Sequence, residues 1–97
     1  MELITKELIQ ELKIPELYGT EDMPTDEKLM LLKYLEPNTG WFWYLCEYDE
    51  IDKRAFGYVV GHESEWGYFS LEEMEAIYTI VRDETFEPIK FKELEKG

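Results

Sequence analysis

The amino-acid sequence predicts an α+β domain: an antiparallel sheet of about four or five strands, an N-terminal helix and a second helix after the strand meander. Three observations favour this fold class. An apolar stripe at helical spacing lies near the N-terminus, aromatic-rich runs separated by turn residues follow, and a capping box then opens a second apolar stripe. The 97 residues contain no internal repeat or linker, so we expect a single domain over residues 1–97.

The N-terminal helix is expected to begin after Thr5, whose side chain can cap its first turn. Its apolar stripe consists of Ile4, Leu8, Ile9 and Leu12. Pro15 disfavours helical geometry at the residue before it and therefore ends the helix. Residues 16–26 contain glycine and proline and show no clear period, which predicts an ordered loop anchored by Leu17 and Tyr18.

The sheet is predicted to begin with a strand hairpin. Residues 28–36 are rich in Leu and Met, which favours a helix. However, the turn sequence at 37–40 follows, and the aromatic run at 41–48 is typical of a strand, so we interpret the two flanking segments as paired strands. A polar turn leads to a further strand at 54–61, and residues 66–69 complete the meander.

A capping box marks the start of the second helix. The Ser70 hydroxyl can accept a hydrogen bond from the Glu73 amide, and the helix is expected to cover residues 71–79. The side chains expected to face the sheet are Leu71, Met74 and Ile77, with Glu72 and Glu75 facing outward. Pro88 in the tail at 82–92 predicts an edge strand or an extended segment there.

The chain is strongly acidic, with 10 basic and 23 acidic residues and a formal net charge of −13. Residues 1–27 hold eight acidic and two basic residues, a net charge of −6. Residues 62–87 hold eight acidic residues and one arginine, a net charge of −7, and the rest of the chain is neutral. Direct binding to nucleic acid is disfavoured because it depends on Lys and Arg side chains that displace counterions, so we expect a basic protein partner.

The sequence also bears on the compartment. No apolar run approaches the roughly 18 residues of a membrane span, and the N-terminal residues lack the pattern of a signal peptide. Cys46 is the single cysteine and has no internal partner for a disulfide, which is typical of a reducing compartment. We therefore expect a cytoplasmic protein that does not contact a membrane.

Few residues are candidates for catalysis or metal binding. Cys46 and His62 are the single cysteine and the single histidine. On the predicted hairpin they lie on the order of 20 Å apart, which is too far for a nucleophilic dyad or a shared zinc ion. The acidic turn at 49–52 lacks the glycine and closing glutamate of a calcium loop. We expect no enzymatic activity and no cofactor, and whether Cys46, His62 or carboxylates hold a metal is left open.

The aromatic run at 41–48 predicts a strand with two apolar faces. One face is expected to pack under the helices. The other is either covered by the N-terminal or C-terminal segment or exposed as a binding patch.

Several short blocks resemble domain of unknown function family 2958, and the resemblance extends over nearly the whole chain. The blocks are residues 5–7, 17–21, 41–44, 47–49, 56–61, 67–73 and 86–88. The Trp-x-Trp-Tyr block at 41–44 and the Gly-Tyr-Phe-Ser-Leu block at 67–71 are the most specific. The resemblance implies a strand at residues 28–36 and a setting on bacterial mobile elements such as plasmids, conjugative elements and prophages. It implies no activity and no catalytic residues.

Together, the charge and this setting predict a small acidic protein that inhibits a host defence or DNA-processing protein, in the manner of anti-CRISPR and antirestriction proteins from phages and plasmids. Its carboxylates would act as a DNA mimic and occupy the basic groove of a partner such as a nucleic-acid-binding host nuclease. The residues expected to bind the partner are Glu63, Glu65, Glu72, Glu75, Asp83 and Glu84, followed by Glu21, Asp22, Asp26 and Glu27. Glu73 is left out because the capping box explains it.

Two alternatives come from other functional classes. The first is an accessory protein of plasmid DNA processing that binds single-stranded DNA or a partner through its aromatic sheet. The second is a metal-binding regulator that uses His62 or Cys46 with nearby carboxylates. The sequence leaves the oligomeric state open.

Overall fold

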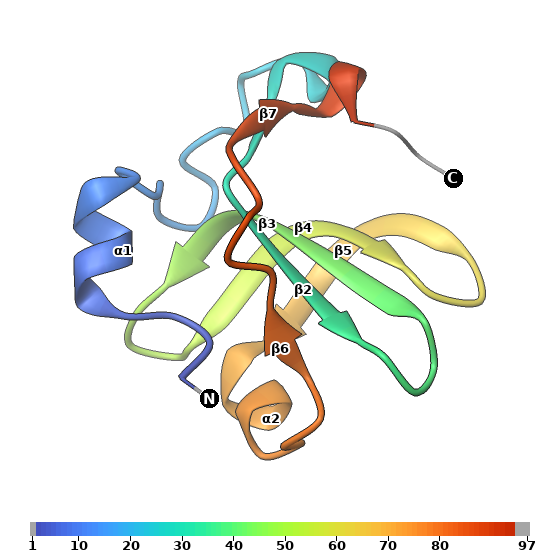
Figure 1. Ribbon diagram of the computed structural model, residues 1–97. Helices are drawn as coiled ribbons and strands as arrows, with labels where there is room; N and C mark the ends of the chain where they lie inside the picture. The colour runs from blue at the N-terminus through green and yellow to red at the C-terminus, as the bar shows by residue number, and fades with distance from the viewer. Residues whose placement is uncertain (1, 95–97) are drawn as a thin grey trace.

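The computed structural model describes residues 2–94 and contains a five-stranded antiparallel sheet with the strand order β5-β4-β3-β2-β6 (Figure 1). Its strands are β2 (Leu32–Glu36), β3 (Trp41–Asp49), β4 (Arg54–Val60), β5 (Ser64–Ser70) and β6 (Val81–Arg82). A second, two-stranded sheet pairs β1 (Leu29–Met30) with β7 (Ile89–Lys90). The helices are α1 (Lys6–Glu11), α2 (Leu71–Glu75) and the 3-10 turns η1 (Thr25–Glu27) and η2 (Phe91–Glu93). The predicted α+β class is confirmed.

The central hairpins follow the predicted strands. β3 pairs with β2 on one side and with β4 on the other, so the hairpin predicted around the turn at 37–40 is confirmed for residues 32–36. The beginning of the predicted strand differs, because Leu29 and Met30 pair with β7 in the second sheet. Gly40 closes that turn with a φ of 79°, a conformation that side chains with a Cβ rarely adopt. The pairing of β3 with β4 shifts register between Leu45 and Glu47, which indicates a β-bulge.

The first face of the sheet packs against the helices and the N-terminal segment. Leu3 and Ile4 join Leu71 and Met74 of α2 in a core that also contains Leu45 of β3. The Tyr34 hydroxyl donates a hydrogen bond of 2.8 Å to the Leu3 carbonyl, and burial raises the pKa of this phenol above its ordinary value. α1 begins as predicted, because the Thr5 hydroxyl accepts from the Leu8 amide at 3.1 Å.

The second face is covered in large part by the C-terminal segment. Phe91 and Leu94 are buried against Met30, Tyr44 and Cys46. This face was expected to be either covered by a terminal segment or exposed as a binding patch, and the C-terminal segment covers it around Tyr44 and Cys46. In Figure 1 this segment, with β7 and η2, runs along the top of the molecule, while α1 and α2 lie at the left and the bottom.

The helix after the meander is shorter than predicted. It ends at Glu75 instead of residue 79, and the side chain of Ile77 is 50% exposed instead of facing the sheet. The chain turns here because Ile80 is buried in the same core as Leu71 and Met74, and the Thr79 hydroxyl donates to the Glu36 carboxylate. A continuing helix would carry both side chains away from β2, with which the next strand, β6, must pair.

The loop at 16–26 is ordered, as predicted, but its anchor was predicted wrongly. Leu17 is half-buried and Tyr18 is 60% exposed. The loop is held instead by the buried Glu47 carboxylate, which accepts hydrogen bonds from the Tyr18 amide at 2.7 Å and the Thr20 amide at 3.1 Å. Hydrogen bonds to an ionised carboxylate are stronger than those between neutral groups, which suits Glu47 to this role.

The tail around Pro88 is extended, as predicted, and supplies an edge strand to each of the two sheets, β6 and β7. Within residues 2–94, no helix has the length and apolar character needed to cross a membrane.

Candidate partner-binding surface

The predicted binding residues of β5 and α2 lie along one edge of the five-stranded sheet. Glu63 is in the turn before β5, Glu65 is on the strand, and Glu72 is in the first turn of α2. All three side chains are exposed. β5 is the outermost strand of the sheet, and no other strand of the described chain covers its outer edge. Glu63 and Glu65 lie at the beginning of this edge, and Glu72 follows its other end, on the order of 25 Å along the strand.

Asp83 and Glu84 lie at the opposite edge, beside β6. Four strand spacings separate the two edges, about 19 Å at about 4.8 Å per strand. The Asp83 carboxylate accepts from the Thr85 amide at 3.0 Å and from the Thr85 hydroxyl at 2.6 Å, and these bonds lower its pKa. Glu84 lies 3.7 Å from the Arg82 guanidinium. The six residues ranked first by sequence therefore do not form one surface.

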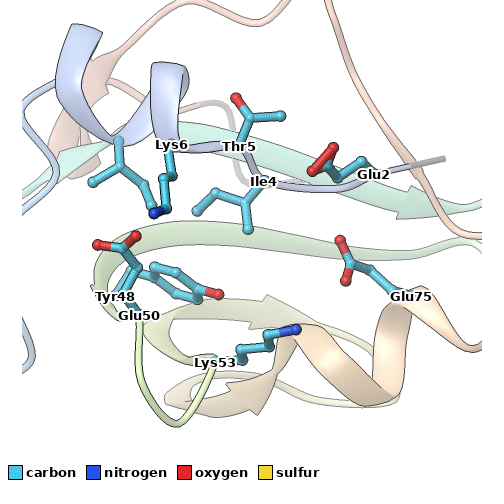
Figure 2. Close-up of a pocket in the computed structure, with 9 residues that line it drawn as sticks. Glu2, Ile4, Thr5, Lys6, Tyr48, Glu50, Lys53 and Glu75 are labelled. Atoms are coloured by element: carbon cyan, nitrogen blue, oxygen red, sulfur yellow. The ribbon is translucent and has the colours of Figure 1, made fainter.

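Glu75 was predicted to face outward, and this prediction is wrong. Its carboxylate accepts a hydrogen bond of 2.8 Å from the Leu3 amide and so ties α2 to the N-terminal segment. Figure 2 shows Glu75 pointing toward that segment, at a shallow pocket of about 240 Å³ that Glu2, Tyr48 and Lys53 also line. Burial, with nearby carboxylates, raises the pKa of Tyr48 to about 12. Glu75 is thus already used within the chain.

The second group of predicted residues belongs to the loop before β1. Glu21, Asp22 and Asp26 are exposed. Glu27 forms ion pairs with Lys90 at 3.1 Å and Lys92 at 2.7 Å, which lower the pKa of its carboxyl group. Glu27 therefore fastens the loop to the C-terminal segment, and the three exposed carboxylates are those open to a partner.

An aromatic contact brings this loop to the β5 edge. The rings of Tyr18 and Tyr68 lie 6.5 Å apart, although the two residues are far apart in the sequence. Their exposed fractions are 60% and 49%. The loop of the first acidic segment therefore contacts β5 at Tyr18, three residues before Glu21.

The two tyrosines belong to an aromatic row that sequence analysis did not single out. Phe56 of β4 lies 5.0 Å from the Tyr68 ring and 5.6 Å from the Trp66 ring. Phe91 covers the Trp66 end at 4.8 Å, whereas the Tyr18 end is open. The alternation of Trp66 and Tyr68 along the strand predicts a shared face, but nothing local in the sequence places Tyr18 beside them.

A buried polar network lies behind this row. Glu47 is 3% exposed, and the Thr20 hydroxyl donates to its carboxylate while the Lys28 amine donates to the Thr20 hydroxyl at 2.8 Å. Cys46 contacts the same hydroxyl at 3.8 Å, and burial raises the pKa of its thiol. Burial makes this thiol a poor nucleophile. The hydrogen bonds from the loop to Glu47 hold the loop against β3.

His62 lies apart from Cys46. Its exposed ring packs edge-on against Trp41 at 5.7 Å, at the first residue of β3, whereas Cys46 faces Thr20 further along the same strand. Over residues 2–94, His, Cys, Asp and Glu side chains form no group of three or more that could hold a metal ion.

Comparisons with protein-family models, with curated proteins and with solved structures find no match to this chain. The resemblance to family 2958 therefore stays a prediction, and the function is argued from the surface itself.

Proposed function

We propose that this protein is a small acidic binding protein that captures a basic protein partner, as an inhibitor encoded by a bacterial mobile element would capture a host defence or DNA-processing protein. One observation carries the proposal. The chain between Arg54 and Arg82 contains no lysine or arginine, and it forms a sheet edge and a helix start that expose Glu63, Glu65 and Glu72. Arg54 of β4 lies opposite Ser70 at the end of β5, so the negative charge of this edge is least offset at its beginning, around Glu63 and Glu65.

The mechanism is electrostatic capture. Carboxylates along the edge would oppose the Lys and Arg side chains with which a nuclease or other DNA-processing protein binds phosphate groups. The net charge of −13 would speed the encounter, and the exposed Tyr18 and Tyr68 rings would add desolvated area and cation–π contacts. The setting on mobile elements that the family resemblance implies supports a partner of this kind.

The aromatic row also supports a second candidate, direct binding of single-stranded DNA by stacking on Tyr18, Tyr68 and Phe56. Such binding normally needs a basic groove. Arg54 is the basic side chain of β4 near Tyr68, and the loop that carries Tyr18 on the other side of this ring is acidic, so the row lies in no basic groove. We expect the protein alone to leave the mobility of single-stranded DNA unchanged in a gel, and a shift would favour this second candidate.

The capture proposal is tested with a triple variant, Glu63→Lys, Glu65→Lys and Glu72→Lys. The immobilised wild-type protein is expected to retain basic, nucleic-acid-binding proteins from a bacterial lysate and to release them between about 0.05 M and about 0.5 M salt. Added DNA should compete for the captured protein. The triple variant should bind the purified captured protein at least about a hundredfold more weakly.

A matched control carries the same change in net charge away from this edge: Glu7→Lys, Glu11→Lys and Glu87→Lys, at three exposed positions. It should keep most of the affinity. Capture that resists salt, or equal losses in both variants, would contradict the proposal. Glu75 is avoided because its substitution would also release the N-terminal segment.

A further inference from the structure

The outer edge of β5 presents unpaired backbone groups. Two hydrogen bonds fix the pairing with β4: the Gly61 amide donates to the Glu63 carbonyl at 3.1 Å, and the Leu71 amide donates to the Lys53 carbonyl at 2.9 Å. Hydrogen-bonded pairs alternate along an antiparallel ladder, so residues 65, 67 and 69 turn their backbone groups toward β4. The amides and carbonyls of Ser64, Trp66 and Tyr68 consequently face outward, where no described strand lies.

This edge has the parts that recognise an extended peptide. A bound strand gains affinity from main-chain hydrogen bonds and specificity from alternate side chains. On one face, the half-exposed Tyr68 offers aromatic surface beside the strand, whereas Trp66 is covered by Phe91. On the other face, a Cβ added at Gly67 would meet no atom within 4 Å, so space for an incoming side chain lies next to the Glu65 carboxylate.

The charge of the edge selects the occupant. Glu63 immediately precedes β5 and Glu65 is its second residue, and Glu72 and Glu73 follow the strand. Each copy of this chain carries a net charge of −13, so pairing of two copies through this edge would bring like charges together. A strand with Lys or Arg at alternate positions would instead oppose each carboxylate with a cation.

We propose that the β5 edge is a strand-addition site for an extended, basic segment of the partner protein. The inference rests on the proposed function and names the contact: the partner adds a sixth strand to the sheet and pairs its backbone with Ser64, Trp66 and Tyr68. Acidic side chains at the edge also disfavour pairing between two copies, which protects the free protein from self-association.

The test uses a synthetic peptide of about eight residues that alternates Arg or Lys with Val or Thr. In the free protein, the backbone amides of Ser64, Trp66 and Tyr68 should exchange with deuterium at least about tenfold faster than those of residues 65, 67 and 69. Saturation with the peptide should slow the first group by at least about tenfold. An Ala- and Lys-rich helical peptide of equal charge should bind at least about tenfold more weakly and leave these amides fast.

Two variants isolate the backbone. Tyr68→Ala and Tyr68→Pro both remove the ring, but only the proline removes the outward amide, which does not bond to β4. Tyr68→Pro should bind the alternating peptide about tenfold more weakly than Tyr68→Ala. If Tyr68→Pro fails to fold, the exchange measurement on the wild-type protein decides.

The outcomes separate this inference from the proposed function. If the captured basic protein binds without protecting the three amides, the edge is not its site and only the strand-addition inference fails. If the peptide protects them but no basic protein is captured from the lysate, only the proposed function fails. Absence of peptide binding, or a dimer in which the edge amides are already protected, would overturn the inference.

Discussion

At the scale of single residues, Glu47 decides where the loop at 16–26 lies. A glutamate on a strand is ordinarily solvated, and its position in the sequence gives no sign of burial. Here the carboxylate accepts from two amides and the Thr20 hydroxyl, and Thr20 in turn accepts from the Lys28 amine. These hydrogen bonds position Tyr18 next to Tyr68 and so help to form the candidate partner-binding surface.

Replacing Glu47 should therefore loosen the loop and lower stability. We expect Glu47→Ala to reduce the free energy of unfolding by about 3 kcal/mol, because it removes the acceptor of the Tyr18 amide, the Thr20 amide and the Thr20 hydroxyl. Glu47→Gln should cost about half as much, since the amide oxygen still accepts. Urea unfolding measures both, with the exposed Glu50→Ala as the control. Equal stability of Glu47→Ala and Glu50→Ala would contradict this role.

At the scale of elements, two neighbouring strands near the bulge differ in the space around their glycines: β4 leaves no room for a side chain at its glycine, whereas β5 does. Gly57 of β4 and Gly67 of β5 are register partners. A Cβ at Gly57 would lie 1.8 Å from the Tyr44 carbonyl oxygen of β3, whereas one at Gly67 has open space. The two glycines look alike in the sequence, but close approach of backbones at the bulge requires only the first.

The two glycines predict opposite outcomes for the same substitution. Gly57→Ala should destabilise the protein by about 3 kcal/mol or more, because the overlap is with backbone that cannot rotate away. Gly67→Ala should leave stability unchanged or raise it by about 0.5 kcal/mol, since alanine restricts the unfolded chain. Chemical unfolding of both variants measures the difference. Similar stabilities would show that β3 and β4 are not so closely apposed.

At the scale of the whole molecule, the charge is unevenly placed. The acidic segments, residues 1–27 and 62–87, meet where Tyr18 contacts Tyr68 and again at the opposite edge of the sheet, where Glu11, Asp83 and Glu84 line one shallow pocket. The ion pairs of the described chain are few, and two of the three use Glu27. Most carboxylates therefore repel one another across the surface, and this repulsion opposes the compact state.

Salt should stabilise the protein as a consequence. Raising sodium chloride from about 0.02 M to about 0.5 M should screen the repulsion and increase the free energy of unfolding by about 1 kcal/mol, or about 4 to 8 °C in Tm. In either triple lysine variant, salt should raise the free energy of unfolding by less, because the net negative charge is smaller in magnitude. Thermal unfolding followed by circular dichroism measures these shifts, and a Tm that falls with salt would contradict the prediction.

The sequence by itself determined the local features of this protein. The Thr5 cap, the turn at 37–40, the aromatic strands and the Ser70 cap each depend on residues within a few positions of one another, and each is confirmed. The α+β class follows from their order. The net charge and its two acidic segments are properties of composition, so they too were fixed without a structure.

Only the tertiary structure decided which acidic residues stand together. The Glu75 bond to Leu3 spans 72 positions and the Glu47 bonds to the loop span 27 to 29, so neither leaves a period in the sequence. The end of α2 was likewise set by burial of Ile80 and by pairing of β6, which override the helical stripe. Long-range contacts of this kind placed the open edge at β5 and divided the predicted site between two edges of the sheet.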